Sequence, residues 1–125
     1  LLTGEEIAAE EFGDDPERVD YGKLFQRRFA LLGDMLELGD ISRAAHEEVG
    51  RQAVENKVDY LVTYGEQAKR IAVVAAAKGL PTLHADTYAQ AADALLNKMQ
   101  PGDALLVKAS RGMALEKVLE IFYKE

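Results

Sequence analysis

The stretch over residues 31–50 reads Leu-Leu-Gly-Asp-Met-Leu-Glu-Leu-Gly-Asp-Ile-Ser-Arg-Ala-Ala-His-Glu-Glu-Val-Gly. It begins with an apolar run of the kind found in strands that are buried on both faces of a parallel sheet. A polar turn with two glycines follows. Ala45, Val49 and Ala53 then recur at every fourth position, which gives one apolar stripe on a helix. The stretch therefore predicts a strand, a sharp turn and a helix in sequence.

The rest of the chain repeats this pattern. Short apolar runs predict strands over residues 29–32, 60–63, 82–85 and 104–107, although His84 interrupts the third. A helical stripe follows each run, and Thr87 with Gln90 fits a capping box at the start of one helix. Strands that alternate with helices predict an α/β fold, a three-layer Rossmann-like domain with a mostly parallel sheet and helices on both faces.

Composition excludes several classes of function. The chain has 125 residues, enough for one core, and 48% of them are hydrophobic. The absence of cysteine excludes disulfides and thiolate chemistry. A net charge of -7 argues against a nucleic-acid partner, which requires a basic face. No apolar run approaches the roughly 20 residues of a membrane span. We therefore expect no membrane insertion and a cytoplasmic location.

The candidate site lies where parallel strands end, since ligands of doubly wound sheets bind beyond the carboxyl ends of the strands. This edge is expected to carry glycines and polar side chains, in the segments 33–35, 64–66, 86–87 and 108–112. Ser110 is placed to cap the helix that follows, which leaves backbone N–H groups free for an anion. Arg111 offers a bidentate partner for a carboxylate and Lys108 a point charge. An ordinary capping serine between solvated cations is the alternative.

Three residues near the first strand allow competing interpretations. The carboxylate of Asp34 either orients a substrate amine or accepts a hydrogen bond from the following loop. His46 is interpreted as a packing or hydrogen-bonding residue rather than a general base or metal ligand, because no second histidine is close in sequence. No cluster with metal-ligand spacing is apparent, so no metal site is predicted. Gly50 in a helix suggests a close contact between helix and sheet.

Two separated motifs resemble one family. The run Leu-Gly-Asp-Met-Leu-Glu-Leu-Gly at residues 32–39, with Ser42 and His46 after it, is similar to the C-terminal domain of the Mur ligases that add D-alanyl-D-alanine to the peptidoglycan precursor. The run Leu-Val-Lys-Ala-Ser-Arg-Gly-Met-Ala-Leu-Glu at residues 106–116 is similar to a second motif of that family. Ala109 stands where the family usually has glycine, and its methyl group could crowd a ligand that approaches the backbone.

The resemblance implies a role for each candidate residue. By that match, Ser110, Arg111, Gly112 and Met113 lie near D-alanyl-D-alanine, whereas Asp34 and Lys108 are expected on the nucleotide or phosphate side. No catalytic residue and no metal ligand are expected on this chain. The family's ligases use ATP and Mg²⁺ to phosphorylate a substrate carboxylate, and an amine then attacks the acyl phosphate. The implied function is substrate orientation within such a peptidoglycan-precursor ligase.

The resemblance also implies missing parts. It covers residues 28–125, the Mur ligase C-terminal-like domain, and residues 1–27 are interpreted as a helical leader of uncertain origin that lacks the family's linker motif. The phosphate-binding Gly-x-x-x-x-Gly-Lys-Ser/Thr loop is absent, so the chain is expected to be inactive alone and to bind no cofactor alone. ATP, Mg²⁺ and the UDP-MurNAc-tripeptide belong to the other domains of the full-length ligase. Separation from them would expose an interdomain face and could produce a homodimer.

Two other classes stay open. A receiver-like or flavodoxin-like signalling or binding module has a similar architecture, and Asp34, Thr63 and Lys108 fall at strand ends as a phosphoacceptor site requires. The acidic pair that would hold Mg²⁺ is not apparent after the first strand. The chain could also be an engineered or recombined fragment without activity. The ligase interpretation requires that Asp34 and Ser110 converge at the same edge of the sheet.

Overall fold

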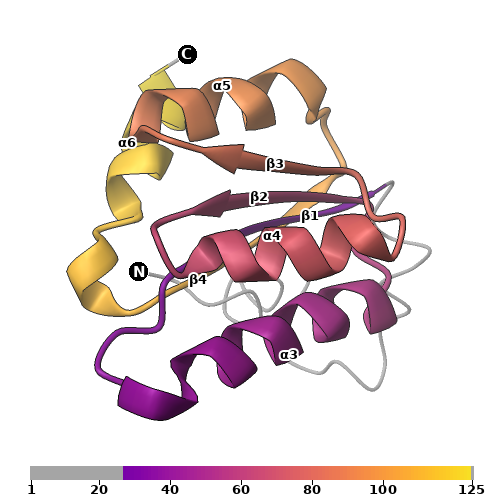
Figure 1. Cartoon of the computed structure of the whole chain (residues 1–125). Coiled ribbons are helices and arrows are strands. Elements are labelled where there is room, and N and C mark those ends of the chain that lie inside the picture. The colour runs from indigo at the N-terminus through magenta and orange to yellow at the C-terminus, as the bar shows by residue number, and fades with distance from the viewer. Residues whose placement is uncertain (1–26, 125) are drawn as a thin grey trace, which may run out of the picture.

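A computed structural model describes residues 27–124, which form one parallel sheet between helices (Figure 1). The four strands lie in the order β3-β2-β1-β4. Their bounds are β1 Arg28–Gly33, β2 Tyr60–Tyr64, β3 Thr82–Ala85 and β4 Ala104–Lys108. All four predicted strands are confirmed, and three of them extend slightly beyond the predicted range. The helical leader predicted for residues 1–27 falls, except for Arg27, outside the described residues.

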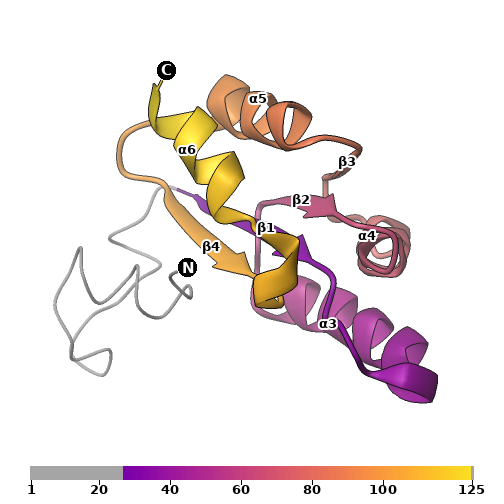
Figure 2. The ribbon, with the colours of Figure 1, turned by 90° about the vertical axis from the view of Figure 1, so that its left-hand side faces the viewer.

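The helices cover both faces of the sheet. Their bounds are η2 Gly39–Ile41, α3 Ser42–Glu55, α4 Ala68–Ala77, α5 Tyr88–Lys98, η3 Arg111–Met113 and α6 Glu116–Lys124. Helices α3 and α4 lie on one face, and α5 and α6 lie on the other (Figure 2). The predicted three-layer α/β architecture is therefore confirmed. Among the residues from 27 to 124, no helix is both long enough and apolar enough to cross a membrane.

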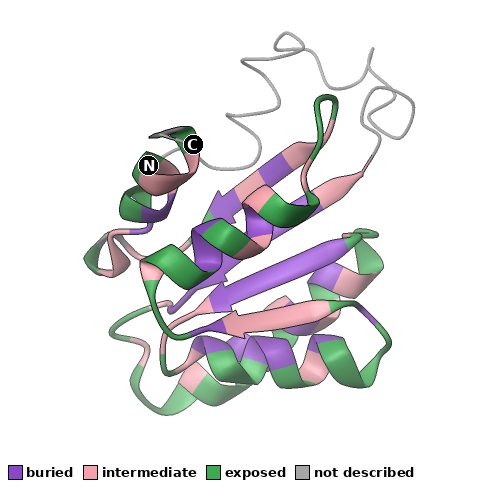
Figure 3. Ribbon diagram, turned by 90° about the horizontal axis from the view of Figure 1, so that it is seen from above, coloured by how far each residue is buried: buried purple, intermediate pink, exposed green. Residues whose placement is uncertain are grey.

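Alternation along the strands divides the core in two, because successive strand side chains point to opposite faces. On β1, Phe29 and Leu31 join the cluster under α5 and α6, whereas Ala30 and Leu32 join the cluster under α3 and α4. Strands β1 and β2 are buried in the middle of the sheet, and the edge strand β3 is only partly covered (Figure 3). The polar His84 is tolerated in β3 because this edge strand is only partly buried.

Local chemistry sets the ends of the helices. Thr87 Oγ1 accepts a hydrogen bond from the Gln90 N–H at 3.0 Å, which confirms the predicted cap of α5. The return bond of this capping box differs from the usual one, since Gln90 Oε1 accepts from Asp86 N–H rather than from Thr87. Helix α4 ends before Gly79, whose φ of +93° suits glycine. The cap at Thr87 matches the start signal in the sequence.

Gly50 serves a different contact from the one predicted. A Cβ at this position would lie 2.7 Å from the Ile71 carbonyl oxygen and 3.0 Å from Val74 Cβ, both on α4. The close approach is thus between helix α3 and helix α4, not between a helix and the sheet. The predicted close contact at Gly50 is confirmed, but the predicted partner, the sheet, is wrong. Periodicity along one helix does not reveal which element faces it.

Candidate functional site

The loops after β1 and β4 meet at the carboxyl edge of the sheet. Ser110 N–H donates to the Asp34 carbonyl oxygen at 3.0 Å, and the Leu36 N–H donates to Ser110 Oγ at 2.8 Å. These two bonds join segments that are more than seventy positions apart in the chain. The predicted convergence of Asp34 and Ser110 is therefore confirmed. It follows from the parallel pairing of β1 with β4, in which Leu32 lies opposite Lys108.

Asp34 also ties this edge to helix α4. Its side chain is almost fully buried, and Oδ1 accepts a hydrogen bond from the Ala68 N–H at 2.6 Å. Helix α4 has no cap of its own at Gln67, so Asp34 supplies a cap from a distant strand, at the helix end that favours negative charge. Gly65 passes directly over the carboxylate, and a Cβ there would lie 2.4 Å from Oδ1. The absent side chain at Gly65 is what allows this approach.

His46 orders the same loop from inside the fold. Its ring is fully buried, and Nε2 accepts a hydrogen bond from the Met35 N–H at 3.0 Å. Nδ1 lies 2.6 Å from the Ser42 carbonyl oxygen, which can only accept, so Nδ1 must carry the proton. Both nitrogens are therefore engaged by backbone groups. The interpretation of His46 as a hydrogen-bonding residue is supported by these contacts.

Ser110 does not play the capping role that its position suggested. The segment after β4 begins with the short turn η3, in which the Met113 N–H donates to the Ser110 carbonyl oxygen. The Ser110 hydroxyl turns instead toward the β1 loop, where it accepts from Leu36 and keeps its own proton free to donate. The methyl group of Ala109 faces Gly33, where an added Cβ would lie only 2.9 Å away. The pair Gly33 and Ala109 is thus a packing contact.

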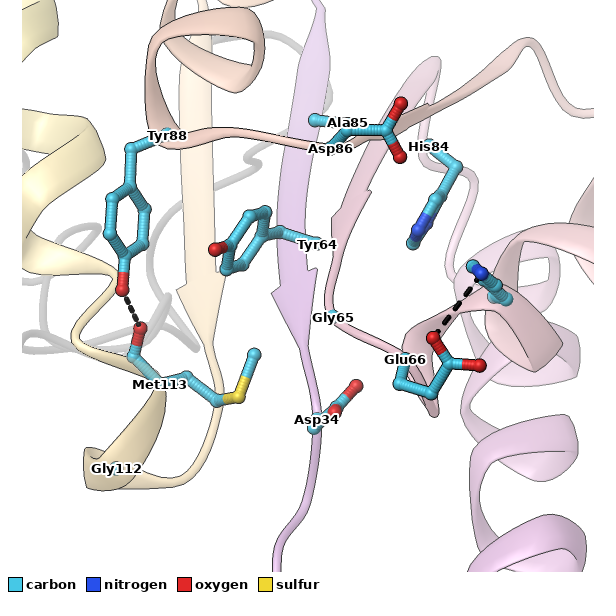
Figure 4. Close-up of a pocket in the computed structure, with 11 residues that line it drawn as sticks. Asp34, Tyr64, Gly65, Glu66, His84, Ala85, Asp86, Tyr88, Gly112 and Met113 are labelled. Carbon is cyan, nitrogen blue, oxygen red and sulfur yellow. Dashed lines mark hydrogen bonds and ion pairs between the residues drawn. The ribbon is translucent and has the colours of Figure 1, made fainter.

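A pocket of about 380 Å³ opens beside this junction (Figure 4). Three of the predicted site residues line it, namely Asp34, Gly112 and Met113. Ser110 lies next to the pocket but does not line it, and Lys108 is exposed at the end of the edge strand β4. The predicted proximity of these residues and of Arg111 to a substrate or phosphate stays a prediction.

Most of the pocket wall comes from residues that were not selected as site residues from the sequence. They lie at the ends of β2 and β3, in the loops that follow, or in the first turns of α4 and α5, and they are Tyr64, Gly65, Glu66, Lys69, His84, Ala85, Asp86 and Tyr88. The signal available in the sequence was their position, since segments 64–66 and 86–87 were expected at the carboxyl edge. These residues lie outside the two family motifs at residues 32–39 and 106–116, so the motifs indicated no role for them.

Two tyrosines form an aromatic wall. The rings of Tyr64 and Tyr88 lie 4.8 Å apart between centroids with a tilt of 32°, and the Tyr88 hydroxyl donates to the Met113 carbonyl oxygen at 2.8 Å. Burial raises the pKa of Tyr64, and the neighbouring Tyr88 and the charge of Asp34 raise it further. Tyr64 is therefore a neutral phenol at physiological pH.

His84 reaches the pocket from β3. Its Nδ1 lies 2.7 Å from the hydroxyl oxygen of Thr63, which is fully buried on β2. Burial lowers the pKa of His84, and the charge of Asp86 opposes this shift without overcoming it. The imidazole is consequently neutral at physiological pH and adds no positive charge to the pocket.

Carboxylates dominate the charge around the pocket. Lys69 pairs with Glu66 at 3.3 Å on the exposed rim, so these two charges largely cancel. Asp34 and Asp86 then remain, and the local charge is negative. Within the described range, no group of three His, Cys, Asp or Glu side chains is arranged to hold a metal ion. The arrangement suits a small cationic group better than a phosphate.

Comparison with known proteins assigns the family. The family model "Mur ligase, glutamate ligase domain" matches residues 19–111. This chain belongs to that family. The resemblance noted in the two sequence motifs is thereby confirmed by a match that covers most of the chain.

Curated relatives carry one common name. The UDP-N-acetylmuramoyl-tripeptide–D-alanyl-D-alanine ligase of Bacillus subtilis is 37% identical over 103 residues, which are 80% of this chain and 21% of the relative. The Mycobacterium leprae ligase of the same name is 34% identical over 105 residues, 80% of this chain and 20% of the relative. The chain thus spans about a fifth of the length of the relatives it matches.

Solved structures agree with this assignment. The MurF ligase of Thermotoga maritima, crystallised with ADP, superimposes with a TM-score of 0.65 at 31% identity and covers 79% of this chain and 22% of that one. Acinetobacter baumannii MurF gives a TM-score of 0.69 at 27% identity, with the same coverage. The α/β fold of the described residues is therefore that of one domain within a larger ligase.

Proposed function

We propose that this chain is the C-terminal, substrate-orienting domain of an ATP-dependent ligase that joins D-alanyl-D-alanine to a UDP-MurNAc-tripeptide, and that it does not catalyse alone. The observation that carries the proposal is the match to ligases of that name over about four fifths of this chain but only one fifth of theirs. The Mur ligase family assignment and the two sequence motifs support the same conclusion.

ATP and Mg²⁺ are assigned to the rest of the ligase. The T. maritima relative was crystallised with ADP, which supports a nucleotide-dependent reaction. The pocket described here does not suit the nucleotide itself, because Asp34 and Asp86 would repel phosphates and the described residues contain no metal-binding group of three. Lys108, exposed beside the junction, keeps its predicted place on the phosphate side.

The pocket is the proposed contribution to substrate orientation. Its volume of about 380 Å³ is near the lower end of the roughly 300–1,000 Å³ common for ligand pockets, which favours a dipeptide over a nucleotide sugar. Gly112 and Met113 line it together with the aromatic wall of Tyr64 and Tyr88. Such a site would hold the dipeptide while its amine attacks an acyl phosphate that the other domains present, and would keep water away from that intermediate.

The signalling alternative gains no support from the contacts. Thr63 is fully buried, and its hydroxyl lies 2.7 Å from His84 Nδ1. A phosphoacceptor site would need an accessible hydroxyl at this strand end. No homodimer is proposed either, since the exposed apolar side chains of Ile41 and Val73 suit a domain that packs against the rest of a ligase.

The proposal is tested by domain replacement. The corresponding domain of the B. subtilis ligase is exchanged for residues 28–125, and phosphate release is measured with ATP, Mg²⁺ and UDP-MurNAc-tripeptide, with and without D-alanyl-D-alanine. We expect release that depends on the dipeptide from the chimera and none from the isolated chain. Release at an enzyme-like rate from the isolated chain would refute its assignment as non-catalytic, and an inactive but folded chimera would count against the ligase role.

A further inference from the structure

One oxygen of Asp34 is left available in the pocket. The side chain is nearly buried, with only 6% of the residue exposed, and the hydrogen bond from Ala68 N–H ends at Oδ1. Within the described part of the chain, no donor is bonded to Oδ2. Figure 4 shows the carboxylate directed toward the space between Met113 and the β2–α4 loop. In the described residues, only Asp103 Oδ1 is a fully buried side-chain oxygen or nitrogen without a partner, so Asp34 Oδ2 is reached from the pocket and can accept a hydrogen bond from a ligand.

The surroundings of this oxygen favour a cation with small apolar substituents. Tyr64 and Tyr88 present a stacked aromatic wall, and Met113 brings its thioether beside Asp34. Aromatic faces attract ammonium groups, and thioethers accommodate methyl groups. The neutral His84 adds no repulsion, and the one lysine of the pocket wall is paired with Glu66. An anion would meet Asp34 and Asp86 with no unpaired lysine in the lining.

We propose that the pocket recognises the ammonium end of the dipeptide, with Asp34 Oδ2 as its acceptor and Tyr64 as the apolar wall. This inference rests on the proposed function for the identity of the ligand, and it assigns the binding polarity of that ligand. It adopts the substrate-amine interpretation of Asp34 that the sequence left open and departs from the expected place of Asp34 on the nucleotide or phosphate side. The Ser110 hydroxyl is not part of the pocket lining and accepts a hydrogen bond from the Leu36 N–H.

The dual use of Asp34 explains why Gly65 is needed. A Cβ at Gly65 would lie 2.4 Å from Asp34 Oδ1 and 2.6 Å from Met113 Cε, so any side chain there would enter the space next to the carboxylate. The φ of +119° at Gly65 also disfavours other residues. The loop thus brings the Ala68 N–H to one oxygen and leaves room beside the other.

The test compares ligands that differ only at one end. The 125-residue chain is titrated, with amide chemical shifts as the readout, with D-alanyl-D-alanine, with its N-acetyl form, which lacks the ammonium, and with D-alanyl-D-alaninamide, which lacks the carboxylate. Loss of one charged hydrogen bond is expected to weaken the N-acetyl form roughly tenfold or more, while the amide keeps the contacts at Tyr64 and Gly65. Equal affinity for the free and N-acetyl dipeptides would overturn the inference and leave the ligase role intact.

Two variants with the same charge change sharpen this test. Asp34→Asn keeps an acceptor for the Ala68 N–H but loses the charge, so affinity for the free dipeptide is expected to fall about tenfold. Asp93→Asn, on the exposed side of α5 and away from the pocket lining, is the control and should bind like the parent. Unchanged affinity in a folded Asp34→Asn variant would overturn the inference. If that variant does not fold, the titrations of the parent chain with the three dipeptides still test the inference.

Absence of any shift at tens of millimolar dipeptide would also overturn the inference, because it predicts a formed pocket in this chain. That result would not touch the ligase role, which the dipeptide-dependent activity of the chimera decides separately. The two proposals can therefore fail independently.

Discussion

The loop after β1, residues 34–38 (the signature loop), and the strand ends of β2 and β3 differ in what their polar groups do. In the loop, the Met35 N–H donates to His46 and the Leu36 N–H donates to Ser110. These polar groups therefore bond to one another inside the fold. At the strand ends, Tyr64, His84 and Asp86 line the pocket and keep polar atoms facing it. The motif at residues 32–39 thus mainly holds the fold together, and it contributes only Asp34 to the lining of the proposed ligand pocket.

Substitution of His46 tests the scaffold side of this comparison most severely. His46→Ala removes a fully buried ring and leaves the Met35 N–H without a partner, so we expect a loss of about 3 kcal/mol in the free energy of unfolding. Urea denaturation provides the measurement. Glu48→Ala, on the exposed side of the same helix, is the control, with an effect below about 0.5 kcal/mol. A loss below about 1 kcal/mol for His46→Ala would show that this histidine does not hold the loop.

Gly50 tests the packing that supports the scaffold. In Gly50→Ala the new methyl group would meet the Ile71 carbonyl oxygen of α4, so α3 and α4 must separate. We expect about 2 kcal/mol of destabilisation despite the better helix propensity of alanine. Gly39→Ala is a matched control, since nothing lies within 4 Å of its Cβ, and backbone strain at its φ of +59° costs only about 1 kcal/mol. Equal effects, again by urea denaturation, would contradict close packing at Gly50.

Ser110 lies at the border between the two regions. Ser110→Ala removes the acceptor for the Leu36 N–H, and we expect a loss of about 1 kcal/mol in stability. Thermal unfolding and dipeptide titration are measured on the same variant. A variant that keeps its full stability but loses dipeptide affinity would mean that Ser110 acts on the ligand rather than on the loop, which reverses our assignment.

His84 in the pocket predicts a small dependence of stability on pH. Because burial lowers the pKa of His84 below its ordinary 6.5, the unfolded chain takes up this proton more readily than the folded one. The contribution of His84 to stability is therefore complete above pH 6.5 and is lost as the pH falls through and below that value. The His84→Gln variant should lose less stability than the parent between pH 7.5 and 5.5 in urea denaturation. Identical pH profiles for the two proteins would contradict a desolvated His84.

Much of this division could be predicted from the sequence. Hydrophobic periodicity predicts the strand positions, and turn chemistry predicts the cap at Thr87. The geometry of parallel strands predicts the convergence of Asp34 with Ser110. The hydroxyl partner of Ser110 and the helix that faces Gly50 could not be predicted, because both depend on contacts between elements distant in the chain. The pocket positions of Tyr64 and His84 could not be predicted for the same reason, because only the tertiary structure brings these two residues together.

The most direct test of the account is a map of backbone amide shifts across this chain on addition of D-alanyl-D-alanine. The account predicts that the largest changes fall at Tyr64, Gly65, Ala85 and Met113, around the pocket, with smaller changes in the signature loop. Changes confined to the groove between α3 and α4, around Arg43 and Val73, with the strand ends unaffected, would contradict it.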